Sequence, residues 1–258
     1  MDEFGKSVTL LILSILSLSA LYAFSDRIPN FALISNLFYP LFSGIAFLLF
    51  FRTYQGYKDW TGESSRAWLC FTVGIGCAFL GGLLLSLQTI IFSKAPGFSI
   101  SGVIFMLGYA FGGYGIYTLY LMFFRGNRTA IHLLIPVIII LGICFTYFFI
   151  WPLASQETDS LVMAARIVPI LLDFVLLSLL VPMALLLFGK PQAHVWIAVA
   201  LGFIIMVAGD LFSALQIFKD SYAAGQISVF LLCSSYAFLA LGAHLQNIKS
   251  TGFSRKLL

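Results

Sequence analysis

Residues 196–218, WIAVALGFIIMVAGDLFSALQIF, form an apolar run that is long enough to cross a membrane and contains one charged residue, Asp210. A bilayer core of about 30 Å needs around 20 apolar residues in an α-helix. No basic residue lies within eight positions of Asp210 on either side, so no near neighbour along the chain neutralises it. The stretch therefore predicts a membrane helix with an acidic group inside it.

The composition of the whole chain points to a lipid bilayer as its main partner. Of the 258 residues, 61% are hydrophobic and 9% are charged, whereas an ordinary soluble domain carries about 25% charged residues. The net charge is only +4, and no basic stripe or reading motif indicates binding to nucleic acid. The four cysteines lie in apolar runs without a C-x-x-C pair, so we expect small buried side chains, no zinc site and no cofactor.

Further apolar segments repeat the pattern of the opening stretch, and together they predict an all-α polytopic membrane protein with eight transmembrane helices. Backbone amides inside hydrocarbon must be hydrogen-bonded within the segment, which favours helices, and the period-two alternation of a β-barrel is absent. The eight expected spans are 7–24, 31–51, 66–92, 99–124, 129–151, 161–188, 193–218 and 223–247.

The basic residues indicate how the chain is oriented, because cytoplasmic loops carry an excess of lysine and arginine. With both termini in the cytoplasm, ten basic residues lie inside and three lie outside. The inner ones are Lys6, Arg52, Lys58, Arg66, Arg125, Arg128, Lys190, Lys249, Arg255 and Lys256, and the outer ones are Arg27, Lys94 and Lys219. We therefore predict a multi-pass protein of the cell (plasma) membrane with cytoplasmic N- and C-termini.

The third and seventh spans resemble one another, which indicates an internal repeat. At a shift of 128 residues, WLCFTVGIGCAFLGGLLLSLQTI (68–90) aligns with the opening stretch, and Trp, Gly, Leu and Gln coincide in order. In the following spans, the tripeptide YAF at 109–111 recurs at 236–238. The second and sixth spans share a proline, Pro40 and Pro169, at a shift of 129 residues.

These matches predict that the chain consists of two duplicated units. The first four-helix membrane repeat covers residues 1–128, and the second covers 129–258 and ends in a short basic cytoplasmic tail. Since each unit has an even number of spans, the two units are expected to be parallel and related by a pseudo-twofold axis along the membrane normal. Binding sites in proteins of this kind tend to lie where the repeats meet.

The second repeat differs from the first by three ionisable residues inside its spans. The replacements, on the repeat alignment, are Asp210 for Gly82, Asp173 for Gly44 and Arg166 for Leu37. Arg166 and Asp173 are seven residues apart, so they share a helix face about 10 Å apart along the axis. The helical rise places Asp210 between them in depth on the next span, within reach of Arg166.

Two interpretations of this cluster stay open. In the first, Arg166 and Asp210 form a clamp between helices, and Asp173 is neutral and hydrogen-bonded to a serine or a tyrosine. In the second, the three residues line a polar cavity that binds a small polar ligand or a proton, with contributions from Gln88 and Gln216. A lone aspartate at a helix centre costs about 2.5–3.5 kcal/mol on insertion scales, so pairing or protonation is expected in either case.

Enzymatic signatures are weak in this sequence. None of the motifs H-E-x-x-H, G-x-S-x-G and G-x-x-x-x-G-K-[ST] occurs. Every lysine lies in a loop, in a tail or at the end of a span, which argues against a retinal-type photoreceptor with a mid-span Schiff base. We therefore expect no enzymatic activity.

Residues 96–109, PGFSISGVIFMLGY, resemble a signature of the multi-pass membrane sensor regions that precede PAS, histidine-kinase or GGDEF modules in archaeal and bacterial signalling proteins. The matching residues are Arg66, Ala67 and Trp68 at the start of the preceding span, and Pro96, Ser99, Leu107, Gly108 and Tyr109. Gly102 stands where that family has an aspartate, and no output domain follows Leu258. The resemblance implies a sensor that signals through a separate partner, or the membrane part of something larger, and it implies no particular ligand.

Three functions are compatible with these observations. The first is a sensory or regulatory membrane module without its own output domain, in which the polar Arg/Asp cluster in the outer half of the bundle acts through a separate signalling partner on the cytoplasmic face. A homo-oligomer is a further expected partner. The second is a proton- or ion-coupled small-molecule transporter that uses the two aspartates. The third is a structural or assembly subunit in which the charges are clamps.

Overall fold

The structure is a computed structural model, and it describes residues 3–28, 30–57, 63–92, 100–124, 128–151, 160–187, 194–218 and 227–254. Within these ranges every element of regular structure is a helix, and no strand occurs. The predicted all-helical class is therefore confirmed for the described part of the chain.

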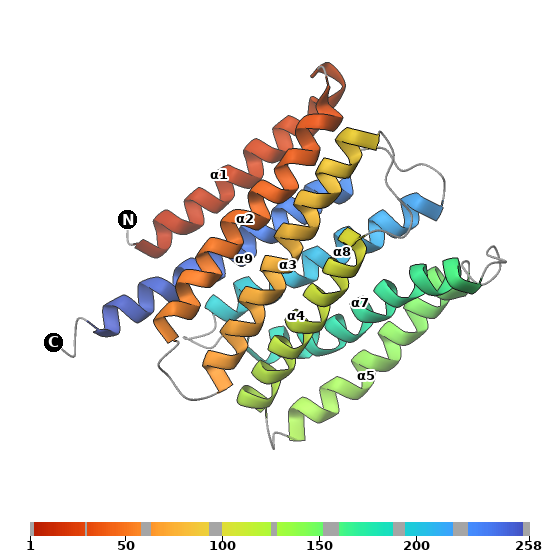
Figure 1. Cartoon of the computed structure of the whole chain (residues 1–258). Coiled ribbons are helices and arrows are strands. Elements are labelled where there is room, and N and C mark those ends of the chain that lie inside the picture. Colours follow the sequence, from red (N-terminus) through yellow and green to blue (C-terminus); the bar gives the residue numbers. More distant parts are fainter. Residues whose placement is uncertain are drawn as a thin grey trace.

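Eight α-helices follow one another along the described residues, and Figure 1 shows how they form a bundle. Their bounds are α1 Glu3–Ala23, α2 Phe31–Tyr57, α3 Glu63–Phe92, α4 Ile100–Phe124, α5 Arg128–Phe145, α7 Ser160–Leu187, α8 His194–Phe218 and α9 Ile227–Ser254. A 3₁₀ turn, Ser25–Arg27, follows α1, and a π-helical turn, Thr146–Ile150, continues α5. The helix ends lie close to those of the expected spans, except that α2 and α9 continue past their expected ends at 51 and 247.

Seven of the described helices are long and apolar enough to cross a membrane, and they are all of the α-helices except α5. The α5 helix contributes a shorter apolar segment, Ile135–Phe148. The described part of the chain thus has the helices of a membrane protein: seven of spanning length and a shorter apolar one where an eighth span was expected. The first helix begins and the last helix ends at the same side of the bundle (Figure 1).

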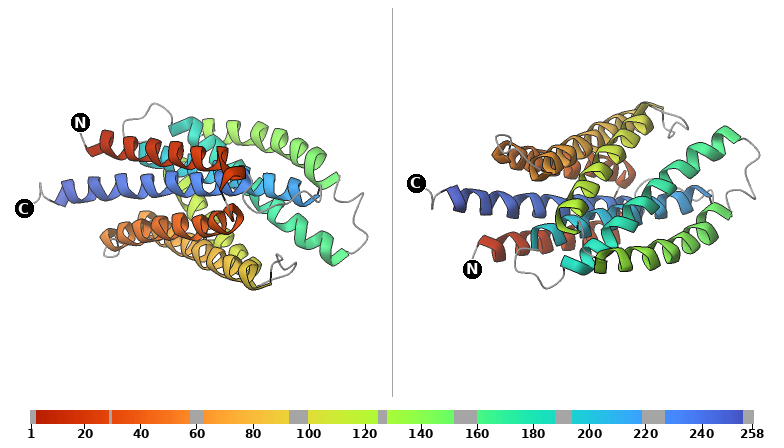
Figure 2. Two further views of the ribbon diagram at one scale, coloured as in Figure 1. Left: turned by 90° about the horizontal axis from the view of Figure 1, so that it is seen from above. Right: turned by 90° about the horizontal axis from the view of Figure 1, so that it is seen from below.

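Six helices build the centre of the bundle and two lie against its outside. In the first half α2 packs on α3 and α3 on α4, and in the second half α7 packs on α8 and α8 on α9. The two halves meet where α4 packs on α7 and where α9 packs on α2. The α1 helix lies on α9 and the α5 helix on α7, as the three views show (Figures 1 and 2).

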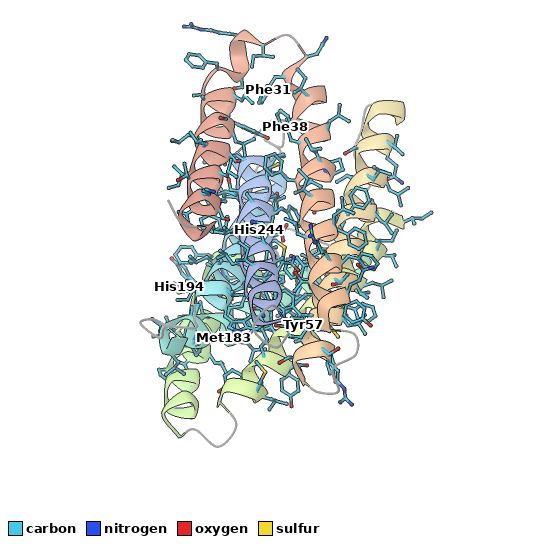
Figure 3. All side chains as sticks on the ribbon, turned by 90° about the vertical axis from the view of Figure 1, so that its left-hand side faces the viewer. Phe31, Phe38, Tyr57, Met183, His194 and His244 are labelled. Carbon is cyan, nitrogen blue, oxygen red and sulfur yellow. The ribbon has the colours of Figure 1, made fainter. Side chains whose placement is uncertain are left out.

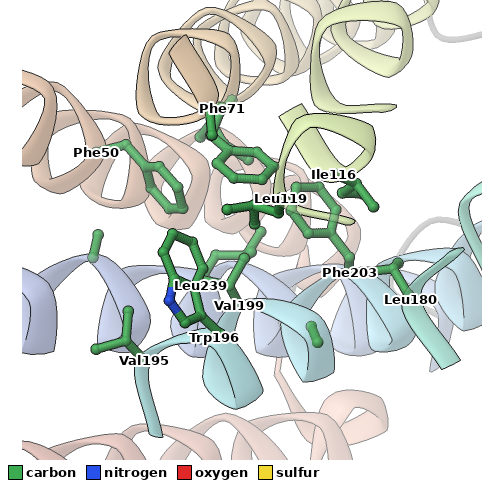
Figure 4. Close-up of a cluster of buried hydrophobic side chains, with 14 of the residues drawn as sticks. Phe50, Phe71, Ile116, Leu119, Leu180, Val195, Trp196, Val199, Phe203 and Leu239 are labelled. Atoms are coloured by element: carbon green, nitrogen blue, oxygen red, sulfur yellow. The ribbon is translucent and has the colours of Figure 1, made fainter. Parts of the chain in front are cut away.

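Aromatic and aliphatic side chains fill the space between the six central helices (Figure 4). The rings of Trp68 in α3 and Trp196 in α8 lie 5.2 Å apart, and those of Phe71 and Phe203 lie 5.6 Å apart, measured between centroids. Phe50 of α2 is fully buried beside Trp68 and Phe71. Because lipid tails are as apolar as these side chains, close packing and not exclusion of water holds such a core together.

The outer helix α1 is attached through a smaller apolar contact. The ring of Tyr22 stands edge-on to that of Phe31 in α2 at 5.1 Å, and Figure 3 labels Phe31 together with Phe38, which also packs on this side. Leu18 is buried between α1 and its neighbours, whereas Leu10 is 65% exposed. The exposed apolar face of α1 is therefore suited to contact with lipid.

Glycines allow neighbouring helices to approach closely at matched places in the two halves. A Cβ atom at Gly74 of α3 would lie 3.0 Å from the Gly108 carbonyl oxygen and 3.0 Å from the Gly112 nitrogen of α4. A Cβ atom at Gly202 of α8 would lie 2.6 Å from Cγ of Leu239 in α9. Small residues of this kind let helix backbones pack together inside a membrane.

The approach of α3 to α4 yields a first prediction. In Gly74→Ala the new methyl group meets backbone atoms that cannot rotate away, so we expect the free energy of unfolding to fall by about 1–3 kcal/mol, the usual cost of overpacking. Reversible unfolding in detergent micelles, followed by near-UV circular dichroism, measures the change.

The matched control is Gly142→Ala on α5, where the nearest atoms to a Cβ belong to the Phe174 ring at 3.8 Å. We expect this variant to be as stable as the wild type or slightly more stable, because alanine favours a helix over glycine. Equal destabilisation by the two substitutions would show that the close approach of α3 to α4 at Gly74 does not require a glycine.

Candidate functional site

Three polar side chains from three helices meet inside the bundle. The hydroxyl of Tyr109 in α4 lies 2.8 Å from Oδ1 of Asp173 in α7, and it is also hydrogen-bonded to Oδ2 of Asp210 in α8. Asp173 is only 1% exposed, whereas Tyr109 and Asp210 are half-buried. We call these three residues the acid–phenol cluster.

The local packing of α4 and α7 directs the cluster residues toward one another. A Cβ atom at Gly108 would lie 3.1 Å from the Gly74 carbonyl oxygen, so this side of α4 is pressed against α3. Successive residues of a helix point about 100° apart, so the next residue, Tyr109, faces away from that contact. On α7, Ile170 is buried against α5 and α8, and Asp173 lies one turn further along the same face.

Counting hydrogens defines the protonation state of the cluster. A phenol has one O–H proton, so Tyr109 can donate to one carboxylate oxygen at a time. Its second contact with a carboxyl oxygen is a hydrogen bond only if that carboxyl is itself protonated and donates to the phenol oxygen. The observed geometry therefore requires that at least one of the two carboxyls is protonated, so that the cluster holds at least one proton more than a tyrosine with two ionised aspartates.

A pair of tyrosines lies next to the acid–phenol cluster. The hydroxyls of Tyr39 in α2 and Tyr236 in α9 are 2.8 Å apart, and their rings are perpendicular at 5.4 Å. The carboxyl group of Asp210 lies within electrostatic range of both hydroxyls, and so does the thiol of the fully buried Cys233. The region thus contains two carboxyls, three phenols and a thiol contributed by five helices.

The structure brings together two of the five site residues expected from the sequence. Asp173 and Asp210 share the hydroxyl of Tyr109 as their partner. The helical rise predicted only that the two residues lie at similar depths on neighbouring spans. Gln88 lies apart from the cluster: its Oε1 accepts a hydrogen bond at 3.3 Å from Ser101, which is about 12 Å from Tyr109 along α4 by the helical rise. The side chains of Arg166 and Gln216 lie outside the described residues.

The residue that joins the two acids was missed by the sequence reasoning. In the sequence Tyr109 stands out only as part of the repeated tripeptide and of the sensor-like signature, and neither pattern predicts a contact of its hydroxyl with the aspartates. Asp173 was expected to bond to a serine or a tyrosine, and the structure selects the tyrosine, since the nearby Ser178 donates to the Phe174 carbonyl oxygen at 2.8 Å. The tyrosine that recurs at matched positions of the two predicted repeats, Tyr109 and Tyr236, is the signal in the sequence that could have found it.

The fold and the cluster define a class: a helical bundle with membrane-spanning helices and an acid–phenol cluster between its central helices. No family model, curated protein or solved structure matches this chain. Its function is therefore inferred from what the cluster can do chemically. A carboxyl–phenol–carboxyl row can hold a proton, release it and pass it from one acid to the other.

Removal of the bridging hydroxyl yields a second prediction. Tyr109→Phe removes the hydroxyl that is hydrogen-bonded to the buried Asp173 and the half-buried Asp210, so we expect the free energy of unfolding to fall by about 1.5–3 kcal/mol, the range for hydrogen bonds to charged groups. The control is Tyr114→Phe on the same helix, whose side chain is 54% exposed and which should unfold like the wild type. Equal stability of the two variants in detergent micelles would exclude a stabilising bridge.

The shared proton yields a third prediction. The infrared spectrum of the wild-type protein at neutral pH should contain the C=O stretching band of a protonated carboxylic acid, shifted when the aspartates carry ¹³C. The band should be absent from Asp173→Asn/Asp210→Asn, in which neither group is an acid. Persistence of the band in that double variant, or its absence from the wild type, would contradict the row of hydrogen bonds.

Proposed function

We propose that this chain is a sensory or regulatory module of the cell membrane, and that its input is the protonation state of the acid–phenol cluster. The observation that carries the proposal is the hydroxyl of Tyr109, which contacts two carboxyl groups on two other helices. Loss of the shared proton leaves two carboxylates competing for one donor. In a medium of low dielectric constant this repulsion is large enough to move helices.

The arrangement of the membrane helices supports two duplicated halves. Three glycine contacts of the first half have counterparts at the aligned positions of the second half. The first-half contacts are Gly74 on Gly112, Gly81 on Phe105 and Gly115 on Phe71, and their counterparts are Gly202 on Leu239, Gly209 on Leu232 and Gly242 on Val199. Repetition of the same contacts at the predicted shifts is what a four-plus-four duplication requires.

A contact between repeat-related residues favours a twofold arrangement of these halves. Trp68 and Trp196 occupy aligned positions, and their rings lie 5.2 Å apart. Residues that are related by a twofold axis and touch each other must lie close to that axis. The tryptophan pair therefore supports an axis that passes between α3 and α8.

On this division the acid–phenol cluster connects the two halves. Tyr109 belongs to the first repeat, and Asp173 and Asp210 belong to the second. Sites at the interface between repeats respond to relative movement of the repeats. Protonation of the cluster would accordingly favour one arrangement of the halves, and deprotonation would favour another.

A packed route leads from the cluster to the cytoplasmic end of the bundle. Along α8, Asp210 and Trp196 are about 21 Å apart by the helical rise. Trp196 contacts Trp68, whose ring stacks with that of Tyr57 at 6.5 Å. The hydroxyl of Tyr57 in turn accepts a hydrogen bond from the side-chain amide of Gln246 near the end of α9. A separate partner at the basic cytoplasmic face would read the change at this end.

The resemblance to multi-pass sensor regions favours this role. The residues that carry the resemblance include Trp68, which lies in the core between the halves, and Tyr109, which joins the two acids. Two of the residues that match the signature thus make contacts between the two halves of the bundle. This coincidence favours signalling over a purely structural subunit.

One observation favours a second function, proton-coupled transport. The cluster lies where the two proposed repeats meet, which is the usual place of the substrate site in transporters built from parallel repeats. Against this, the described helices α2 and α7 continue unbroken through Pro40 and Pro169. Transporter sites of this kind are typically formed by discontinuous helices.

Tryptophan fluorescence tests the proposed role and yields a fourth prediction. The chain has four tryptophans, and Trp60→Phe/Trp151→Phe leaves only the central pair, Trp68 and Trp196. In nanodiscs this protein should show a reversible fluorescence change over about pH 4 to 10, the interval between ordinary carboxyl and phenol titration. The same protein with Asp173→Asn/Asp210→Asn should show a flat profile, since the cluster no longer titrates.

A flux measurement separates sensing from transport. Proteoliposomes with a trapped pH-sensitive dye should show no proton flux above that of protein-free vesicles under an imposed pH gradient. Flux that disappears in Asp173→Asn/Asp210→Asn would replace the sensory role by proton-coupled transport. If the fluorescence changes with pH in the same way with and without Asp173→Asn/Asp210→Asn, the two acids do not sense pH. Their role would then be only to hold the helices together.

A further inference from the structure

The two halves meet along two contacts that are equivalent in the proposed repeat, and these contacts differ in chemistry. We call the packing of α4 on α7 the first seam and the packing of α9 on α2 the second seam. A tyrosine at the same position of the repeat closes each seam, Tyr109 in the first and Tyr236 in the second. The following inference rests on the proposed function.

The second seam contains a neutral counterpart of the acid–phenol cluster. Tyr236 bonds to Tyr39 at 2.8 Å, and the ring of Tyr39 fills the space beside Gly82. A Cβ atom at Gly82 would lie 2.2 Å from that ring, so no acid fits there. In the second repeat the aligned position holds Asp210. A phenol has therefore taken the place that a carboxyl occupies in the other half.

The second seam is also tied by further hydrogen bonds toward the inner end of the bundle. Thr53 of α2 donates to the carbonyl oxygen of Ala243 in α9 at 3.1 Å. The amide of Asn247 donates to the Leu49 carbonyl oxygen at 3.4 Å, in addition to the bond from Gln246 to the hydroxyl of Tyr57. Together with the tyrosine pair, these bonds extend over about five turns of α2.

The first seam is less extensively joined in the described part of the chain. Tyr109 of α4 donates a hydrogen bond to Asp173 of α7. At Gly113 of α4 the helices are less closely packed, since a Cβ atom there would lie at an ordinary van der Waals distance of 3.5 Å from Leu176. Two further aromatic residues of α4, Tyr114 and Tyr117, are 54% and 47% exposed. The α5 and α7 helices form a pair at one side of the bundle, on the far side of this seam (Figure 1).

We propose that the second seam is a fixed hinge between the two halves, and that the first seam opens when the acid–phenol cluster loses its shared proton. Separation of α4 from α7 does not move Asp173 away from Asp210, since both belong to the second half. It relieves the deprotonated cluster by admitting water to the buried Asp173, so that two carboxylates that one hydroxyl cannot satisfy become hydrated. The second seam has no carboxyl to titrate at the matching position, so it stays closed.

Other titratable groups that face the cluster are neutral side chains or lie outside the description. The α2 and α9 helices present Tyr39, Tyr236 and Cys233, whereas Cys77 of α3 lies beside Gly108 on the side of α4 that faces away from Tyr109. On α7 the side chain of Arg166 lies outside the described residues. Of the described groups, the two aspartates are those that acquire charge in the ordinary working range of pH.

Distances between spin labels test the hinge and yield a fifth prediction. Labels are placed at exposed residues in a chain whose native cysteines are replaced by alanine: Phe111→Cys with Val175→Cys across the first seam, and Leu41→Cys with Ile227→Cys across the second. In nanodiscs, the first distance should lengthen by more than about 2 Å on going from acid to alkaline pH, as expected for a hinge movement, and the second should not change.

Two variants keep this test decisive. With Asp173→Asn/Asp210→Asn the first distance should be independent of pH. Tyr39→Phe weakens the second seam without adding a charge, so it should broaden the second distance distribution and still leave it independent of pH. A pH response of the second distance, alone or together with the first, would overturn the hinge while leaving the sensory role intact.

The remaining outcomes separate the inference from the proposed function. If both distances are constant while the fluorescence of Trp68 and Trp196 responds to pH, the hinge is wrong and sensing stands. If neither distance nor fluorescence responds, both the hinge and the sensory role are wrong.

Discussion

Carboxyl groups inside a membrane bundle must find hydrogen-bond donors within the protein, and this requirement links the parts of the structure described above. Each unpartnered acid at mid-membrane costs about 2.5–3.5 kcal/mol. Here Asp173 and Asp210 depend on one hydroxyl, that of Tyr109. That hydroxyl is correctly placed only because Gly74 and Gly108 let α4 lie directly on α3. The polar cluster and the close packing of the first half are therefore parts of one arrangement.

The bundle combines rigid packing with one chemically adjustable contact. Large rings such as Trp68, Trp196 and Phe203 fill the centre, and dense packing of this kind has a small number of discrete arrangements. The acid–phenol cluster lies beside that centre. In the proposed function, loss of a proton from the cluster would convert a local change of charge into a choice between whole arrangements of helices.

Much of the fold followed from the sequence, and less of the site did. Apolar runs near the length of a bilayer predicted the eight α-helices of the described residues and most of their ends, but α2 and α9 continue past the apolar runs and the regular α-helix of α5 ends early, at Phe145. Helical rise placed Asp173 and Asp210 at comparable depths on adjacent helices. Charge alone suggested Arg166 as their partner, because opposite charges are the obvious pairing. A neutral donor such as Tyr109 has no such signature among eleven tyrosines, and only the packing of α4 shows where its hydroxyl points.

The packing of Tyr39 on Gly82 has a consequence for how this sequence can change over time. Enlarging residue 82 while the tyrosine remains produces a collision, and shrinking residue 39 while the glycine remains leaves a void and an unbonded Tyr236. Either single step is costly, so the two positions can be exchanged only together. We expect residues 39 and 82 to change together among proteins that descend from the same ancestor. The chemical difference between the two halves, an acid in one and a phenol in the other, should therefore be difficult to reverse.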